Sequence, residues 1–516
     1  MSRVSIASGS QLSADAGAAI ADAGGNAVDA AIGAAIVSMC TEPGIIAPGG
    51  SGYLTIWGPD SDPVVIDAYA EMPGRGLKPE RFGLGGREVH IDYGGGMTTV
   101  VGAGSVATPG AFAGFGAASQ RYGAVPWEEI LRPAVDIAET GFPISSASGQ
   151  YLVYSHEMIF GWQQESYRAI HHPDGRPLQV GETAHIPGLA NSLTTIAREG
   201  PESLYTGSLG HAIADEIQKG GGLLTREDLA AYEAVTRKPV RITIDDWDVV
   251  TNPPPAVGGA ALAAMLLLVD DHPFSEWTES ELTHLIEAQR AVFEYRFREL
   301  DEATERVGPA EHLLEAARLG EPGRLLDSPS TIHTSAVDVN GLGCAVTVSA
   351  GYGSGLMVPG TGLWMNNSLG EIELNRAGYH AQQPGDRLIS NMAPTVARHK
   401  DGTVLAIGSP GADRITSALC CVLVNFLHIG MSLSDAIDAS RVHYERFQGV
   451  PTVSHEPGLA VAAPEGLELR RFPDKSMYFG GVQAALFSSA AGLYATADPR
   501  RAGGTARGGI ASPSGS

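Results

Sequence analysis

The sequence predicts an α+β protein built as one large unit. Two observations support this prediction. Apolar residues at helical spacing and short strand-like runs follow one another through the first 300 residues, and strand-like runs dominate after position 331. No internal repeat and no low-complexity linker divides the 516 residues into separate domains. Helices packed on both faces of strand layers would bury such a pattern.

The expected elements of the first 300 residues follow from this spacing and from turn signals. They are two helices within 11–40 joined at Gly24-Gly25, a turn-rich loop over 42–52, a strand at 53–57, a helix at 126–139, a helix that starts after Thr225, a strand over 240–251 and a long helix over 278–300. After Thr331 we expect strands at 331–338, 343–350, 361–366, 394–398 and 403–408, and a helix at 415–427. The Gly/Ser-rich tail beyond Arg501 is expected to be frayed.

The composition excludes several classes of protein. The chain is 43% hydrophobic, and its 58 acidic residues outweigh 34 basic ones, which gives a net charge of -24. This charge disfavours nucleic acid as a partner. The four cysteines, Cys40, Cys344, Cys420 and Cys421, lack metal-ligand spacing, so we expect buried thiols, no metal and no cofactor.

The start of the chain carries no signal-peptide pattern, and no run of 18 apolar residues occurs. We therefore expect a cytoplasmic protein without a membrane partner.

The stretch SPSTIHTSAVDVNG, residues 328–341, has two interpretations. One is a loop that enters a buried strand, since Thr331, Ile332 and Val337 favour strands. The other makes Thr331 the first residue of a new chain, released when the bond after Ser330 is cut. Context from the rest of the sequence decides between them.

Motifs along nearly the whole chain provide that context. They are GGNAVDAAIGAA (24–35), TPGAFAGF (108–115), LLTREDLAAY (223–232), TIHTSAVDVNG (331–341), GTGLWMNN (360–367), SNMAPT (390–395), SPGADRI (409–415) and ADPRRAGG (497–504). In order and spacing the chain resembles the γ-glutamyltranspeptidases, which are N-terminal-nucleophile hydrolases. The resemblance implies a four-layer αββα sandwich.

The resemblance also implies that the precursor cuts itself between Ser330 and Thr331. Chains 1–330 and 331–516 would then pair as one intertwined domain, with a possible higher oligomer. A free α-amine has an unperturbed pKa of ~7.7 to 8, so Thr331 would supply both the nucleophilic hydroxyl and its own base.

Further catalytic residues are carried over by position in the motifs. Ser349 aligns with a hydroxyl that holds the amine of the nucleophile, and Thr347 lies on the same strand face. Gly411 and Ala412 match the pair whose N–H groups form the oxyanion hole. His333 shares a face with Thr331, which leaves open a Ser-His-Asp-like arrangement or a core histidine.

The glutamyl pocket is where this sequence departs from the family. The arginine that follows the Ile-Asp pair in relatives is missing after Ile66-Asp67, and Tyr69 stands in its neighbourhood. The asparagine that binds the substrate amine becomes Gly351. The remaining expected substrate-binding residues are Asn367, Ser368, Glu371, Ser390 and Asn391. Glutathione is therefore a doubtful substrate, because a carboxylate would lack its cation.

Three functions remain open from the sequence. The first is an autoprocessed hydrolase acting through an acyl-enzyme on a small, non-glutathione amide. The second is a C–C bond hydrolase that removes an oxalyl-type group, as relatives in alkylproline antibiotic biosynthesis do. The third is a scaffold protein that has lost catalysis.

Overall fold

The computed structural model describes residues 3–92, 96–270, 274–300, 306–318, 331–375, 377–462 and 464–509. Ser330, the residue expected before the cut, lies outside these ranges, whereas Thr331 lies within them. Within the described part of the chain, no helix is long and apolar enough to cross a bilayer.

Two antiparallel sheets form the centre of the molecule. The first sheet has the strand order β22 (Gly504–Gly508), β1 (Val4–Ser8), β11 (Ile332–Asp338), β12 (Gly343–Ser349), β2 (Ser51–Trp57), β3 (Val64–Ala68) and β8 (Val235–Arg237). The second has the order β21 (Gly492–Ala497), β20 (Gln483–Ser488), β16 (Val404–Gly408), β15 (Thr395–His399), β10 (Trp247–Thr251) and β9 (Val240–Ile244). Both sheets combine strands from before and after position 330.

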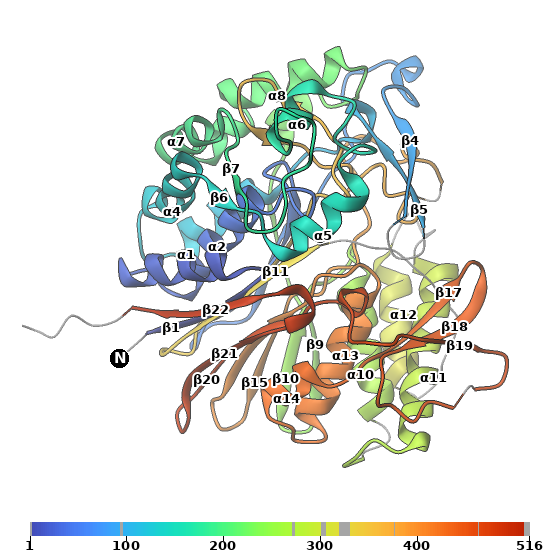
Figure 1. Cartoon of the computed structure of the whole chain (residues 1–516). Helices are drawn as coiled ribbons and strands as arrows, with labels where there is room; N and C mark the ends of the chain where they lie inside the picture. Colours follow the sequence, from blue (N-terminus) through green and yellow to red (C-terminus); the bar gives the residue numbers. More distant parts are fainter. Residues whose placement is uncertain are drawn as a thin grey trace, which may run out of the picture.

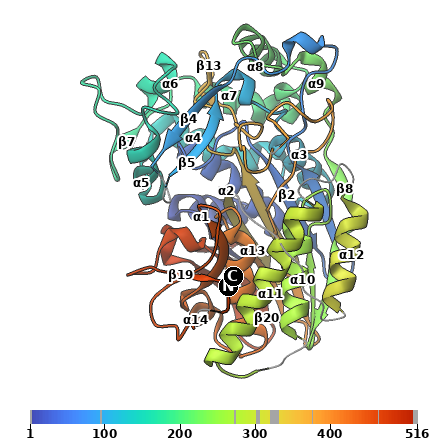
Figure 2. The same cartoon turned by 90° about the vertical axis from the view of Figure 1, so that its right-hand side faces the viewer.

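Helices cover the outer face of each sheet. The upper half of Figure 1 holds α1 (Gln11–Asp22), α2 (Ala27–Thr41), α3 (Ala111–Tyr122), α4 (Trp127–Thr140), α5 (Ser146–Ser155), α6 (Gln164–Ala169), α7 (Leu189–Glu199), α8 (Ser208–Lys219) and α9 (Arg226–Ala231). The lower half holds α10 (Gly258–Asp270), α11 (Glu279–Tyr295), α12 (Val307–Arg318), α13 (Arg414–Leu427) and α14 (Leu433–Asp438). Figure 2 shows α10 to α12 side by side below the upper helices.

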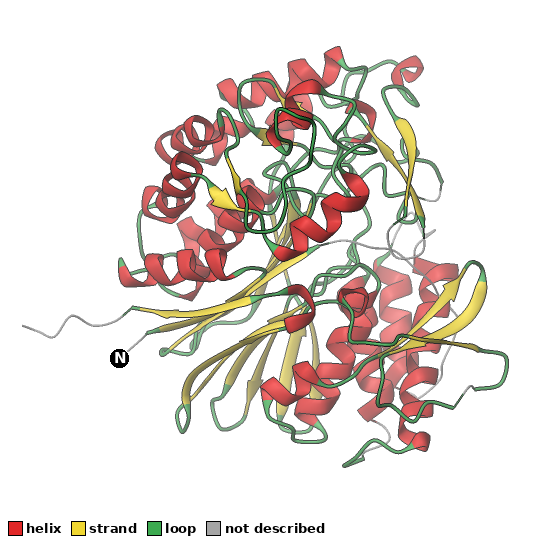
Figure 3. Cartoon of the chain, viewed as in Figure 1, coloured by secondary structure: helices red, strands yellow, loops and turns green. Residues whose placement is uncertain are grey.

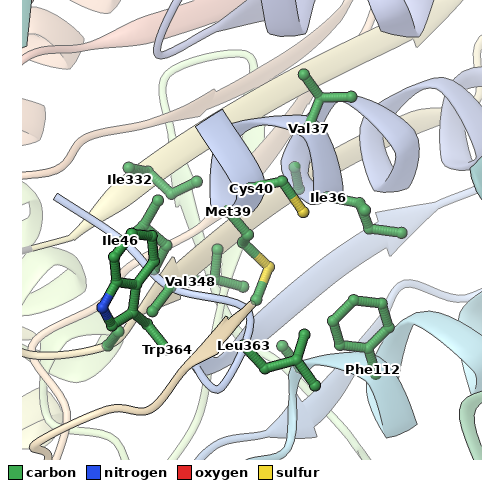
Figure 4. Packing of buried hydrophobic residues seen from close by; sticks show 14 of the residues in the cluster. Ile36, Val37, Met39, Cys40, Ile46, Phe112, Ile332, Val348, Leu363 and Trp364 are labelled. Atoms are coloured by element: carbon green, nitrogen blue, oxygen red, sulfur yellow. The ribbon is translucent and has the colours of Figure 1, made fainter. Parts of the chain in front are cut away.

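The layers confirm the predicted αββα sandwich. Helix α2 packs on β1, β11 and β12, these strands pack on β16 and β20 of the second sheet, and α10 and α13 pack on the other face of that sheet. Figure 3 shows the two groups of strands between the helices. Strand alternation explains this packing: Ile332 and Val348 face α2 in the cluster of Figure 4, whereas Val337 and Ala345 face the second sheet.

Smaller elements complete the fold. They are the hairpins β4 (Arg87–Ile91) with β5 (Met97–Val101), β6 (Phe142–Pro143) with β7 (Thr183–Ala184) and β13 (Met357–Val358) with β14 (Leu363–Trp364), and the sheet of β17 (Val442–Phe447), β18 (Val450–His455) and β19 (Glu468–Arg471). The short helical turn η5 (Met477–Phe479) precedes β20.

The first two helices form as the sequence predicts. Helix α2 begins at a capping box, in which the side chain of Asn26 accepts from the N–H of Asp29 and the carboxylate of Asp29 accepts from the N–H of Asn26. All 15 residues of α2 are buried, so the helix forms the centre of the upper core.

Three expectations about elements were wrong. Residues 240–251 form the hairpin β9–β10 rather than one strand, because Asp245 takes a positive φ of 47° at the turn. The strand expected at 361–366 is limited to β14. The tail is ordered as far as β22, since Gly504 to Gly508 pair with β1 and so complete the edge of the first sheet.

Candidate active site

Thr331 stands immediately before β11, at the centre of the first sheet, and is only 2% exposed. In the antiparallel pair of β11 and β12, Ile332 lies opposite Val348. One further residue along this register sets Thr331 opposite Ser349, which is also buried and accepts from the N–H of Gly351 at 3.0 Å. The structure thus brings the expected nucleophile and Ser349 to the same end of two adjacent strands.

His333 is a core histidine held by hydroxyl groups. Its Nδ1 lies 2.7 Å from Oγ1 of Thr347, and its Nε2 lies 2.8 Å from Oγ of Ser335. The hydroxyl of Ser335 donates to the carbonyl of Gln483, so it accepts from Nε2–H, and Nδ1 accepts from Thr347. Burial lowers the pKa of His333 to about 3, so the ring is neutral. Thr347 therefore holds His333, and the geometry favours the core histidine over a triad.

The neutral state of His333 gives a testable pH dependence of stability. The unfolded chain binds a proton near the ordinary pKa of 6.5, whereas the folded chain does so only near about 3. Stability contributed by His333 is therefore present above pH 6.5 and is lost as the pH falls below it. We expect the free energy of unfolding of the wild type, relative to His333→Gln, to fall by about 2 kcal/mol between pH 7 and pH 5.

Urea unfolding of both proteins at several pH values measures this difference. The control is Thr194→Ser, at an exposed position without an ionisable group, and its difference from the wild type should not change with pH. A pH-independent difference for His333→Gln would contradict a neutral His333.

The expected oxyanion turn follows β16. The ring of His333 lies against Gly408, the last residue of β16, so the turn that follows leaves the sheet at the end where Thr331 begins β11. Gly411 and Ala412 both have positive φ, 125° and 68°. Among the described residues, none accepts from their two N–H groups. Ala412 is a strained non-glycine residue, and such strain is typical of functional turns.

A buried polar chain supports this turn. Asp413, directly after Ala412, accepts from Nδ2 of Asn391 at 2.7 Å and pairs with Arg296 at 3.2 Å. Arg296 is fully buried and opens a π-helical turn at the end of α11. Asn391, expected to bind substrate, thus supports the expected oxyanion turn. The Arg296–Asp413 pair was missed by the sequence, because its two residues lie 117 positions apart.

Tyr69 lies at the end of β3, within contact of other predicted pocket residues. Its ring stacks on Tyr53, with centroids 5.5 Å apart and planes at 17°. Its hydroxyl is hydrogen-bonded to the side chain of Ser390, and Glu371 is close enough to raise its pKa further beyond the effect of burial. Tyr69, Ser390 and Glu371 therefore come together from three separate segments.

Several polar atoms around this cluster have no hydrogen-bond partner among the described residues. They are Oδ1 of Asn367, Oγ of Ser368, Oε1 of Glu371 and the hydroxyl of Tyr53. Burial raises the pKa of Glu371 well above its usual range. Buried polar atoms are rarely left unpaired in folded proteins, so these atoms indicate a place for ordered water or for a polar ligand.

The space beside Gly351 is filled by the side chains of Asn367 and Glu371. A Cβ atom at Gly351 would lie 2.3 Å from Oδ1 of Asn367 and 3.1 Å from Cδ of Glu371. An asparagine side chain at this position would therefore displace both residues. The pocket is built around the glycine.

A cation from a distant segment, Arg387, lies beside Tyr69, although no arginine closely follows Ile66-Asp67 in the sequence. Arg387 donates to the carbonyl of Tyr69 at 3.0 Å and to Oε1 of Glu71 at 2.9 Å, and its Nε lies 3.5 Å from Asp67. Its charge is compensated by these two carboxylates. Asp67, an acid near the predicted pocket with no basic residue close to it in the sequence, was the signal that a distant arginine must come close.

One potential cation-binding group occurs in the described residues, formed by Asp245, Asp270 and His428, whose ligand atoms lie within 4.8 Å of one another. It belongs to the β9–β10 turn and to the ends of α10 and α13. None of the predicted site residues is part of it.

Two antiparallel sheets packed face to face between helical layers, with Thr331 at the start of a central strand, define the class of N-terminal-nucleophile hydrolases. The chain belongs to the gamma-glutamyltranspeptidase family, because the model of that family matches residues 13–508. It is therefore assigned to the amide hydrolases and transferases of this family.

Relatives agree with the family. The glutathione hydrolase proenzyme of Escherichia coli (strain K12) is 28% identical over 540 residues, covering 96% of this chain and 90% of that protein. The Acylase ACY 1 proenzyme of Pseudomonas sp. (strain SE83) is 30% identical over 472 residues, covering 86% and 83%. The crystal structure of cephalosporin acylase from Bacillus halodurans superposes with a TM-score of 0.82 at 26% identity, covering 98% and 96%.

Proposed function

We propose that this protein cuts its own chain before Thr331 and then hydrolyses a small amide other than glutathione through an acyl-enzyme on that threonine. The processed chains, 1–330 and 331–516, would remain paired. The observation that carries the proposal is the position of Thr331, at the start of β11 and in register with Ser349, where a new N-terminus would lie between the two sheets.

The reaction follows from these groups. The α-amine of Thr331 takes the proton of its own hydroxyl, and Oγ1 attacks the amide carbonyl. The N–H groups of Gly411 and Ala412 stabilise the oxyanion, and the amine leaves with a proton from the ammonium group. Water then hydrolyses the ester by the same route and restores the threonine.

The proposed acyl group is one without the γ-glutamyl carboxylate and amine. Arg387 donates to the carbonyl of Tyr69, and its charge is already paired with Asp67 and Glu71. Burial raises the pKa of Glu371 well above its usual range, which disfavours the carboxylate form that an ammonium group would need. The relatives named as acylases support this direction.

A panel of four p-nitroanilides tests the acyl preference. Butyryl, 4-aminobutyryl, glutaryl and γ-glutamyl anilides differ only in whether the amine and the carboxylate are present. We expect kcat/KM for the butyryl anilide to exceed that for the γ-glutamyl anilide by roughly two to three orders of magnitude, because a buried carboxylate without a free cation costs several kcal/mol.

Efficient turnover of the γ-glutamyl anilide would contradict this preference. It would mean that Arg387 exchanges Glu71 and Asp67 for the substrate carboxylate. Arg387→Gln would then reduce turnover of the γ-glutamyl and glutaryl anilides and leave that of the butyryl anilide higher than either.

A second candidate reaction is the removal of an oxalyl-type group by C–C bond cleavage. It is favoured by the stacked Tyr53–Tyr69 pair, which suits a flat conjugated group, and by Glu371 near that pair, whose pKa is raised well above its usual range by burial. Thr331 would attack the ketone, the carbanion would leave and take up a proton, and water would release oxalate. An oxalyl ketone added to the panel separates the two reactions through the formation of oxalate.

A further inference from the structure

We propose that Asp245, Asp270 and His428 form a binding site for a divalent transition-metal cation, and that zinc is the cation that their donor atoms fit best. One ligand atom of each residue lies within 4.8 Å of the other two. This inference goes beyond the proposed function, because none of the three residues takes part in the reaction at Thr331. A cation held here would fasten three elements of the lower half of the molecule to one another.

The three ligands come from elements that pack together. Asp245 lies in the turn between β9 and β10, Asp270 is the last residue of α10, and His428 caps the C-terminal end of α13. Helix α10 packs on both α13 and β9. Figure 1 shows these elements together in the lower half of the molecule. The fold thus gathers the three side chains from segments that are far apart in the sequence.

Two helices end at this site. Neither α10 nor α13 has a basic residue in its last turn. The carbonyl groups at the C-terminal end of a helix carry a partial negative charge, which favours a cation and disfavours a carboxylate. Asp270 nevertheless stands at the end of α10, and Asp245 adds a second acid. A bound cation would compensate the negative charge that converges on the ring of His428.

The side chain of His428 is buried between the two acids, with only 3% of it exposed. Its Nδ1 lies 3.7 Å from Oδ2 of Asp245, and its Nε2 lies 3.6 Å from Oδ1 of Asp270. Nε2 has no hydrogen-bond partner among the described residues. A neutral imidazole has one N–H donor, so one of its nitrogens presents a lone pair to a carboxylate. Two such groups repel each other unless a cation lies between them.

The distances favour a metal ion over a proton as this cation. A hydrogen bond from an imidazolium to a carboxylate is about 2.7 to 2.9 Å long. Both contacts of His428 are longer than this. Two ligands that each lie about 2.0 to 2.1 Å from a tetrahedral zinc ion are roughly 3.4 Å apart. The separations around His428 are close to that value.

The donor atoms and their exposure indicate the class of cation. An imidazole nitrogen favours zinc and other transition metals, whereas magnesium and calcium prefer oxygen ligands. The side chains of Asp245 and Asp270 are 64% and 31% exposed, so water would complete the coordination from the solvent side. Asp270 also makes a further interaction of its own. This is compatible with its role as a ligand, because ligating carboxylates are themselves hydrogen-bonded.

Isothermal titration calorimetry with zinc chloride tests this proposal, on processed enzyme that has been treated with EDTA and then freed of the chelator. We expect zinc to bind at least tenfold more tightly than magnesium. His428→Gln should weaken zinc binding by roughly tenfold or more, because it removes the nitrogen ligand. Zinc should also raise the midpoint of thermal unfolding of the wild type by about 2 °C or more, and not that of His428→Gln.

Asp245→Asn is a second variant that does not disturb the core. Asp245 lies in an exposed turn at a positive φ of 47°, a conformation that asparagine also adopts readily. The loss of one charged ligand should weaken zinc binding by roughly tenfold.

His90→Gln is the matched control. His90 also stands beside an aspartate, with Nε2 3.8 Å from Oδ1 of Asp92, but it does not belong to the group of three ligands. Its variant should bind zinc as the wild type does. Weak binding of zinc by exposed histidines is thereby separated from binding at His428.

The test does not depend on the proposed function. His428 lies at the opposite end of α13 from the oxyanion turn, about 21 Å away for a helix of 14 residues. Hydrolysis of the best anilide should therefore be the same with and without zinc, and Thr331→Ala should bind zinc as the wild type does.

The proposal is overturned if zinc does not bind, if magnesium binds equally well, or if His428→Gln, Asp245→Asn and His90→Gln bind zinc alike. The first of these results would leave a proton as the cation between the two carboxylates. The third would place the bound zinc elsewhere on the molecule.

Discussion

Thr331→Ala is expected to remain a single chain of 516 residues, whereas the wild type should separate on a denaturing gel into fragments of 330 and 186 residues (516 minus 330). The substitution removes the hydroxyl that, in the proposed mechanism, attacks the carbonyl of Ser330, so neither the cut nor the free α-amine should form. Hydrolysis of the best anilide should fall by roughly four orders of magnitude or more, since nucleophile and base are lost together. Intact-mass spectrometry and steady-state kinetics measure the two effects.

Two variants control this experiment. Thr331→Ser keeps a hydroxyl and should still cut, more slowly. Thr334→Ala removes a threonine from the same strand. The hydroxyl of Thr334 lies on the opposite face, 2.8 Å from that of Ser8, so this variant should be processed normally. Intact wild-type protein with full activity would rule out the N-terminal threonine mechanism.

Gly411→Ala is expected to lower kcat by roughly two to three orders of magnitude with little change in KM. With φ at 125° and Gly480 only 2.8 Å from the new Cβ atom, the turn must shift, and its N–H groups would no longer point at the oxyanion. Because the oxyanion exists only near the transition state, the loss should fall on kcat. Circular dichroism would establish that the variant is folded.

The matched control is Gly430→Ala, after the end of α13. Gly430 also has a positive φ, 76°, but no atom of the described chain lies within 4 Å of the place that its new methyl group would take. Both variants place an alanine at a positive φ, but at Gly430 the site is untouched. Ala412→Gly should keep activity, since it retains the N–H donor and relieves strain. Equal kcat values for Gly411→Ala and Gly430→Ala would exclude the turn as the oxyanion hole.

Local patterns in the sequence were sufficient for much of the fold. The cap at Asn26 and the alternation on either side of Gly341 depend on residues close in sequence, and the helix α2 and strands β11 and β12 formed as predicted. The hairpin β9–β10 was read as one strand because Asp245 and Asp246 do not interrupt the alternation strongly. The strand β22 was missed because its hydrogen-bond partners are about 500 residues away in β1.

The sequence alone determined the family and the candidate nucleophile. The proposed mechanism requires the hydroxyl of Thr331, its own α-amine and the peptide bond before it. All three lie within the motif around Thr331. The charges and shape of the pocket were decided by the tertiary structure. Arg387 reaches Asp67 from 320 positions away in the sequence. Charge compensation and ring packing depend on proximity in space, which no local pattern in the sequence records.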